Sequence, residues 1–289
     1  MLNLKSIGRF ISFNFHQLLL VILTLVANAS ALEIEVSKED WGNAGEDDIK
    51  AVLQSAASAI YKHCLNTRID TILVHRRFDC PHTNFDRDSS GRIVIGLHTG
   101  DRYWAQYAYQ FSHEFCHVLA DHSNDWRKKW RSLDSPHLWF EECLCEAASL
   151  FTLRAMGQSW VVNPPYPNCR SFAPSLAEYA QDRIDDPAHA LTPDETFQKW
   201  FQKHEKELRH NWKQRNKNTI IAKQLLPLFE AEPEAWEAVT YINLVSRDPN
   251  MSFYDFLSNW KKITPKDHQP FIDKIFVCFF EQAPAEFKK

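Results

Sequence analysis

The chain has 289 residues, of which 44% are hydrophobic and 24% charged, and its formal net charge is −4. This length allows a large hydrophobic core in one or two domains. Only seven glycines are present, which argues against a glycine-rich nucleotide-binding or repeat architecture, and the mild acidity makes nucleic acid and anionic membranes poor partners.

The N-terminus has the layout of a secretory signal peptide over residues 1–31. Lys5 and Arg9 precede the apolar run 18–27, and small residues that suit a signal peptidase follow it. A retained membrane anchor is the alternative, but the uninterrupted apolar run is too short to span a bilayer comfortably. We therefore expect a secreted or periplasmic protein without an integral membrane segment after cleavage. Loss of Lys5 and Arg9 takes the net charge from −4 to −6.

Strand patterns occur early in the chain. Alternating or short apolar runs predict strands at residues 32–36, 71–74 and 93–97. The helical spacing of apolar residues predicts a helix over 47–64, and turn-forming residues predict a polar loop over 77–91.

Helices dominate the rest of the chain. An amphipathic helix is expected after a start signal at 99–101, with one apolar stripe from Trp104 to Val118. Another helix is expected over 138–155, followed by a proline-containing linker or loop at 163–174. Six further helices are expected near 175–184, 194–210, 217–229, 233–245, 252–261 and 267–281.

The seven cysteines are an odd number, so at least one thiol stays unpaired in a monomer. Export makes disulfides possible. We expect Cys64 to pair with Cys80, because one ends a predicted helix and the other follows the next strand. A second pair is expected between Cys169 and Cys278.

The motif that carries chemistry is His-Glu-Phe-Cys-His at residues 113–117. Residues four apart lie on the same face of a helix, so His113 and His117 can bind one metal, and two imidazoles so placed suit Zn²⁺. Glu114 lies about 100° round the helix, where it can flank the metal and take a proton from a zinc-activated water. Two histidines that merely pack are the alternative. The amphipathic helix context favours the metal.

A catalytic zinc needs a third protein ligand and an open fourth position. Position 123 is serine, so a third histidine six residues after His117 is excluded. The next predicted helix is largely apolar but carries carboxylates, which are costly to bury without a partner. Glu142 is expected to bind the metal and Glu146, one turn on, to accept the free N–H of a ligand histidine. Glu141 and Glu146 remain alternative ligands.

These two motifs together resemble the gluzincin class of metallopeptidases, the thermolysin-like zincins. The resemblance covers residues 93–151, and the usual second motif is Glu-x-x-Ser/Ala-Asp, where this chain has Cys145 and Glu146 at the last two positions. The resemblance implies Glu142 as ligand and Glu146 as the carboxylate behind a ligand histidine. It also implies that strand 93–97 is an edge strand along which substrate peptides lie antiparallel.

The expected fold is therefore zincin-like α+β. A lobe over 32–135 would contain the small sheet and the metal-binding helix, and a helical lobe over 136–289 would carry the third ligand. The expected function is an exported zinc metallopeptidase acting on peptides or proteins, with Glu114 as general base. The alternatives are a zinc amidase acting on cell-wall crosspeptides and a zinc-containing envelope binding or structural protein without turnover. Tyr241 and His204 are of the type that stabilises an oxyanion, but their spacing selects neither.

Overall fold

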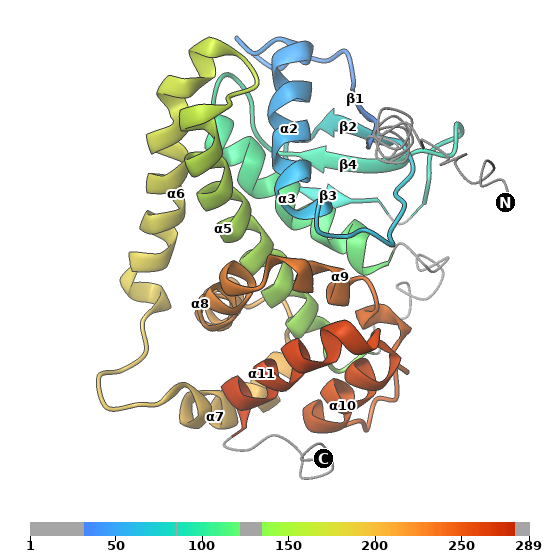
Figure 1. The fold of residues 1–289 in the computed structure, drawn as a ribbon, viewed down its shortest axis with the longest axis vertical. Helices are drawn as coiled ribbons and strands as arrows, with labels where there is room; N and C mark the ends of the chain where they lie inside the picture. The colour runs from blue at the N-terminus through green and yellow to red at the C-terminus, as the bar shows by residue number, and fades with distance from the viewer. Residues whose placement is uncertain (1–31, 85, 122–134, 281–289) are drawn as a thin grey trace, which may run out of the picture. The chain divides into compact units, whose positions relative to one another are not determined.

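The computed structural model describes residues 32–84, 86–121 and 135–280. The predicted signal peptide lies outside these residues. The chain from Glu33 onward forms one compact unit, and this unit is α+β, with a small sheet and a mostly helical C-terminal part, which confirms the expected class (Figure 1). The proposed boundary between two lobes near residue 135 stays a prediction.

The sheet has four strands in the order β1-β2-β4-β3. Strands β1 (Ile34–Val36), β2 (Ile72–Arg76) and β4 (Ile93–Leu97) run parallel, and β3 (His82–Thr83) pairs antiparallel with β4. Helix α2 (Glu46–Tyr61) connects β1 to β2. Parallel strands need such a crossover, and it covers one face of the sheet with apolar side chains.

The prediction that residues 93–97 form an edge strand is wrong. Strand β4 is paired on both sides, with β2 and with the short β3, and all five of its residues are buried, as is typical of an interior strand. The expected polar loop at 77–91 contains β3, whose His82 and Thr83 pair with Gly96 and Ile95. The antiparallel edge of this sheet is therefore β3.

Two helices form the centre of the molecule. Helix α3 (Trp104–Ala120) packs against β4 and against α5 (Leu138–Val162). Helix α5 also contacts α2, α6 (Ala173–Asp185) and α8 (Arg215–Ala231), so it is buried on nearly every side (Figure 1). A helix in such a position has to be apolar all round, and this explains why its few carboxylates need specific partners.

The remaining helices agree with the predicted ones, apart from local differences. Helices α7 (Phe197–His210), α10 (Phe253–Ile263) and α11 (Gln269–Phe279) lie close to their expected positions. The helix expected at 233–245 is broken into α9 (Trp236–Val239) and flanking 3-10 turns Pro233–Ala235 and Ile242–Leu244. The hydroxyl of Thr240 bonds to the carbonyl of Glu237 and competes with the helix.

Three further segments are also helical. The expected loop at 163–174 folds into a 3-10 helix, Pro167–Phe172, which leads directly into α6. Two short 3-10 turns lie at Pro187–His189 and Lys266–His268. Among the residues that the structure describes, no helix has the length and apolarity needed to cross a bilayer.

Neither expected disulfide is formed, because all seven cysteines are free. Cys64 is buried, whereas Cys80 is exposed beside β3, so the two do not meet. Cys169 and Cys278 are unpaired as well. Proximity of Cys64 and Cys80 in the order of elements does not bring their Cβ atoms close together, because that distance depends on the tertiary structure.

The C-terminal helices pack through an aromatic cluster around Phe253. Its ring centroid lies 4.7 Å from that of Trp139 on α5, 5.0 Å from that of Phe140, and 4.9 Å from that of Phe279 on α11. These tilted and edge-on contacts add to the burial of large apolar surfaces. Phe253 thus ties α10 and α11 to the start of α5, next to its carboxylates.

We predict that Phe253→Ala lowers the free energy of unfolding by about 3–5 kcal/mol, since Phe253 is only 1% exposed and leaves a cavity. Chemical denaturation of the protein measures this change. The matched control is Phe78→Ala, at a side chain that is 80% exposed, which should cost less than about 1 kcal/mol. Equal losses in the two variants would contradict the role of the cluster.

Candidate metal centre

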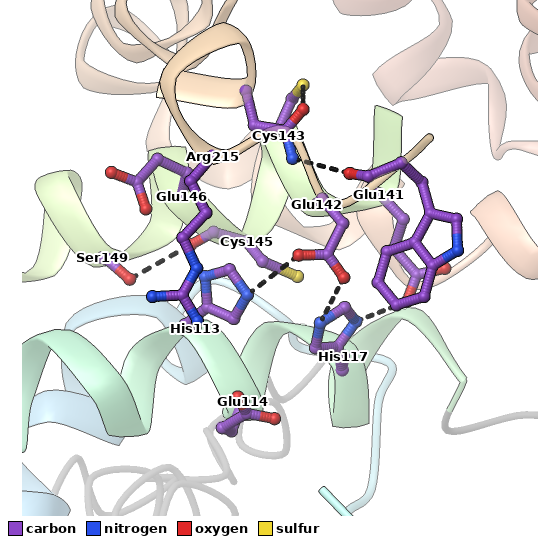
Figure 2. Close-up of polar contacts among 12 residues, drawn as sticks. His113, Glu114, His117, Glu141, Glu142, Cys143, Cys145, Glu146, Ser149 and Arg215 are labelled. Atoms are coloured by element: carbon purple, nitrogen blue, oxygen red, sulfur yellow. Dashed lines mark hydrogen bonds and ion pairs between the residues drawn. The ribbon is translucent and has the colours of Figure 1, made fainter. Parts of the chain in front are cut away.

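The two histidines of the motif lie one turn apart on α3 and face α5 (Figure 2). Their ring centroids are 5.3 Å apart. The carboxylate of Glu142, from the first turns of α5, lies between them. Its Oε2 is 3.3 Å from His113 Nε2, and its Oε1 is 3.5 Å from His117 Nε2. The crossing of two helices thus brings three potential ligands together.

These separations fit a metal ion. Zinc holds nitrogen and oxygen ligands at about 2.0–2.1 Å in a tetrahedron, so neighbouring ligand atoms lie about 3.3 Å apart. Two different oxygens of Glu142 make these contacts, Oε2 with His113 and Oε1 with His117, and each separation is close to one tetrahedral edge. The carboxylate of Glu142 therefore lies close enough to both imidazoles to serve as a third ligand beside His113 and His117.

The other nitrogen of His117 has a partner of its own. His117 Nδ1 lies 2.6 Å from Oε1 of Glu141, a buried carboxylate whose Oε2 accepts a bond of 3.0 Å from Nδ2 of Asn243. A carboxylate at Nδ1 fixes the tautomer and leaves Nε2 available, which is the usual support of a metal-binding imidazole. Glu141 therefore performs the task that the sequence assigned to Glu146.

Glu146 has other partners than a ligand histidine. It accepts hydrogen bonds from Tyr109 Oη at 2.5 Å and Thr219 Oγ1 at 3.1 Å, and it pairs with Arg183 at 3.4 Å. It thus joins α3, α6 and α8 to α5. The expectation that Glu146 supports a histidine fails because Glu146 lies beside Tyr109, one turn before His113 on α3, where the two helices are still in contact.

The charges and burial of His113, His117 and Glu142 favour a positive charge between these three side chains. Burial works against charge on both imidazoles, but the hydrogen bonds to Glu142 raise the pKa of His113. For His117, the bonds to Glu141 and Glu142 overcome burial and raise the pKa well above its usual range. Burial would raise the pKa of Glu142, yet its bonds to the two histidines lower it. A buried carboxylate that stays ionised here needs a cation, either protons on the imidazoles or a metal ion.

Cys145 offers a second possible ligand set, because its sulfur lies within 4.8 Å of the ligand nitrogens of His113 and His117. Burial raises the pKa of the Cys145 thiol well above its usual value, and a hydrogen bond with Cys116 raises it further. A metal binds the thiolate and not the thiol. A bound metal would itself lower the pKa of the thiol, so Cys145 and Glu142, whose oxygens lie 3.3 and 3.5 Å from the two nitrogens, are alternative third ligands.

Glu114 lies next to His113 on α3 but on another side of the helix (Figure 2). Its carboxylate is buried, and its Oε2 lies 2.9 Å from the hydroxyl of Thr83, which is also 3.1 Å from the Glu114 backbone carbonyl. Strand β3 therefore fixes the orientation of the expected general base. This contact could not be predicted from the sequence, because β3 has only two residues and no clear alternation.

A cavity of about 740 Å³ connects these groups. His113, Glu114, His117 and Glu142 all line it, and Glu146 lines it too. Residues 79–83, which include β3, form one part of the wall, and residues from 212 to 218 at the start of α8 form another. Neither Tyr241 nor His204 contributes to this wall.

No protein-family model, curated protein or solved structure matches the chain. The function therefore has to be inferred from the site itself.

We predict that Glu141→Gln weakens zinc binding about 10–100-fold, because it removes the carboxylate that orients His117. Competition with a chromogenic zinc chelator measures the affinity. The matched variant Glu146→Gln should leave zinc affinity unchanged and lower only the stability, since Glu146 joins helices. Weaker zinc binding in Glu146→Gln than in Glu141→Gln would contradict this assignment.

Three further variants separate the two ligand sets. We expect about one zinc per chain in the purified protein, retained in Cys145→Ala and lost in Glu142→Ala and His117→Ala. Elemental analysis of the metal content provides the measurement. Loss of zinc in Cys145→Ala with retention in Glu142→Ala would make the cysteine the third ligand instead.

Proposed function

We propose that the protein is a zinc-dependent peptidase in which His113, His117 and Glu142 hold the metal and Glu114 is the general base. The observation that carries this proposal is the position of Glu142 between two imidazole nitrogens, at 3.3 and 3.5 Å, in the wall of a large cavity. A buried packing cluster would not need to open into such a cavity.

The residues of the chain divide the work of hydrolysis. Zinc bound at this position supplies Lewis acidity, which lowers the pKa of a water toward about 7 and polarises the scissile carbonyl. Glu114 takes the proton of the attacking water and returns it to the leaving amine. Thr83 holds the Glu114 carboxylate in one orientation through the contact at 2.9 Å. Glu141 contacts Nδ1 of His117 at 2.6 Å, so that Nε2 of the same ring is left to bind the metal.

Strand β3 is the place where a substrate peptide would bind. It is the antiparallel edge of the sheet, and both of its residues line the cavity. Main-chain pairing along an edge gives affinity without strong sequence preference. A zincin-like arrangement of the fold, in the gluzincin manner, is part of this proposal, supported by an edge strand, a histidine helix and a following helix that supplies a carboxylate.

The sequence supports two further parts of the proposal. The pattern of residues 1–31 supports export to the periplasm or the exterior, and the net charge supports peptide substrates over nucleic acid. The amidase acting on cell-wall crosspeptides would use the same residues. An envelope protein that binds zinc without turnover would keep the metal ligands but not depend on Glu114.

We predict that Glu114→Gln lowers peptide hydrolysis by at least about 10²–10⁴-fold, because the amide cannot accept the proton of water. The assay uses internally quenched peptide libraries with the zinc-loaded mature protein, and zinc content should stay at the wild-type level. Glu178→Gln, at an exposed position of α6, is the matched control with full activity.

Full activity of Glu114→Gln would remove Glu114 from the mechanism. A zinc-loaded wild-type protein that cleaves neither linear peptides nor cell-wall crosspeptides would favour the binding protein.

A further inference from the structure

Two cations in the wall of the cavity have no carboxylate partner among the described residues. Lys213 precedes α8 and Arg215 is its first residue, and both line the cavity that contains His113 and Glu142. In Figure 2 the side chain of Arg215 extends from the start of α8 toward the side of the site that carries His113. No ion pair joins either cation to an acidic residue of the described chain.

The carboxylates in the same wall are already engaged. Asp79 pairs with Arg77 at 2.6 Å, and Glu146 pairs with Arg183. Glu114 accepts from Thr83, and Glu142 lies between the two histidines. The third cation that lines the cavity, Arg183, is thus neutralised by the protein, whereas Lys213 and Arg215 are not. Their charge is available to a bound molecule.

The surroundings of Lys213 and Arg215 add to this positive potential. The ammonium of Lys213 lies 4.7 Å from the ring centroid of Trp212, which also lines the cavity and positions the cation. Arg215 begins a helix of 17 residues, whose first N–H groups carry partial positive charge. The start of α8 therefore combines Arg215 and the preceding Lys213 with the positive end of the helix dipole, and both cations line the cavity.

Strand β3 borders the same space as the two cations. His82 and Thr83 line the cavity together with Lys213 and Arg215. A peptide that lies along β3 would pass within reach of the start of α8.

We propose that Lys213 and Arg215 form a subsite for a carboxylate of the bound peptide. This proposal rests on the proposed peptidase function and adds a substrate class to it, namely peptides with a negative charge near the scissile bond. The carboxylate is either the free C-terminus or an acidic side chain. Arginine binds a carboxylate through two parallel N–H donors, and such charge-assisted bonds are stronger than neutral ones.

The test measures binding without turnover. The zinc-loaded Glu114→Gln protein is titrated calorimetrically with two matched peptide pairs. One pair is acetyl-Ala-Phe-Leu as the free acid and as the amide, and the other is acetyl-Ala-Glu-Leu amide against acetyl-Ala-Gln-Leu amide. We expect the charged member of at least one pair to bind about 10–100-fold more tightly than its neutral counterpart. The pair that shows the preference identifies the source of the carboxylate.

Variants assign the preference to the two cations. Arg215→Gln and Lys213→Gln, each combined with Glu114→Gln, should each reduce the ratio of charged to neutral affinity about tenfold. Lys203→Gln is the matched control, because Lys203 is an exposed lysine of α7 outside the cavity wall. It should leave the ratio unchanged.

Three results would overturn the subsite. The first is equal affinity, or no measurable binding, for both members of both pairs. The second is a charge preference that survives both substitutions. The third is an equal loss of affinity for charged and neutral peptides in Arg215→Gln. The last result would mean that Arg215 contacts a group that charged and neutral peptides share.

Hydrolysis by the wild-type protein distinguishes the subsite proposal from the peptidase proposal. Equal cleavage of acid and amide peptides leaves the peptidase standing without the subsite. A charge preference in binding without any cleavage leaves the subsite standing without the peptidase.

Discussion

The crossing of α3 and α5 buries ionisable groups that cannot be buried separately. His117 and Glu141 are buried between these helices and Glu142 is largely buried, and each would have a large desolvation cost alone. Together they compensate one another, through a 2.6 Å contact at Nδ1 of His117 and two longer contacts at Glu142. The longer separations are those that a metal ion would bridge, so the packing of the two central helices and the proposed chemistry depend on the same contacts.

The elements around this crossing serve it in different ways. Strand β3 has two residues, yet it holds the carboxylate of Glu114 and provides the sheet edge that borders the cavity. Glu146 ties α3, α6 and α8 to α5 and so keeps the start of α8 in the cavity wall. The aromatic cluster around Phe253 anchors the N-terminal part of α5. The position of Glu142 thus depends on contacts from both ends of the chain.

The cavity has an uneven distribution of charge that bears on the proposed function. Its acidic side chains all contact groups of the protein, whereas Lys213 and Arg215 have no acidic partner within the described part of the chain. A peptidase that used only main-chain pairing to β3 would have little need of such cations. Free cations opposite the sheet edge would add a charge requirement to an otherwise permissive site, and they connect the candidate chemistry with a class of substrate.

The sequence by itself determined the α+β class, most helices and the placement of two histidines on one helix face. These are local properties, since apolar periodicity defines a helix and the spacing of four residues puts His113 and His117 on one face. It also indicated Glu142, because a carboxylate in an apolar helix needs a partner. Only the tertiary structure decided which neighbour supports His117, that β3 and not β4 is the edge, and that the cysteines stay apart. Each of these depends on how distant segments meet: the contact between α3 and α5 places Glu141 beside His117 and Glu146 beside Tyr109.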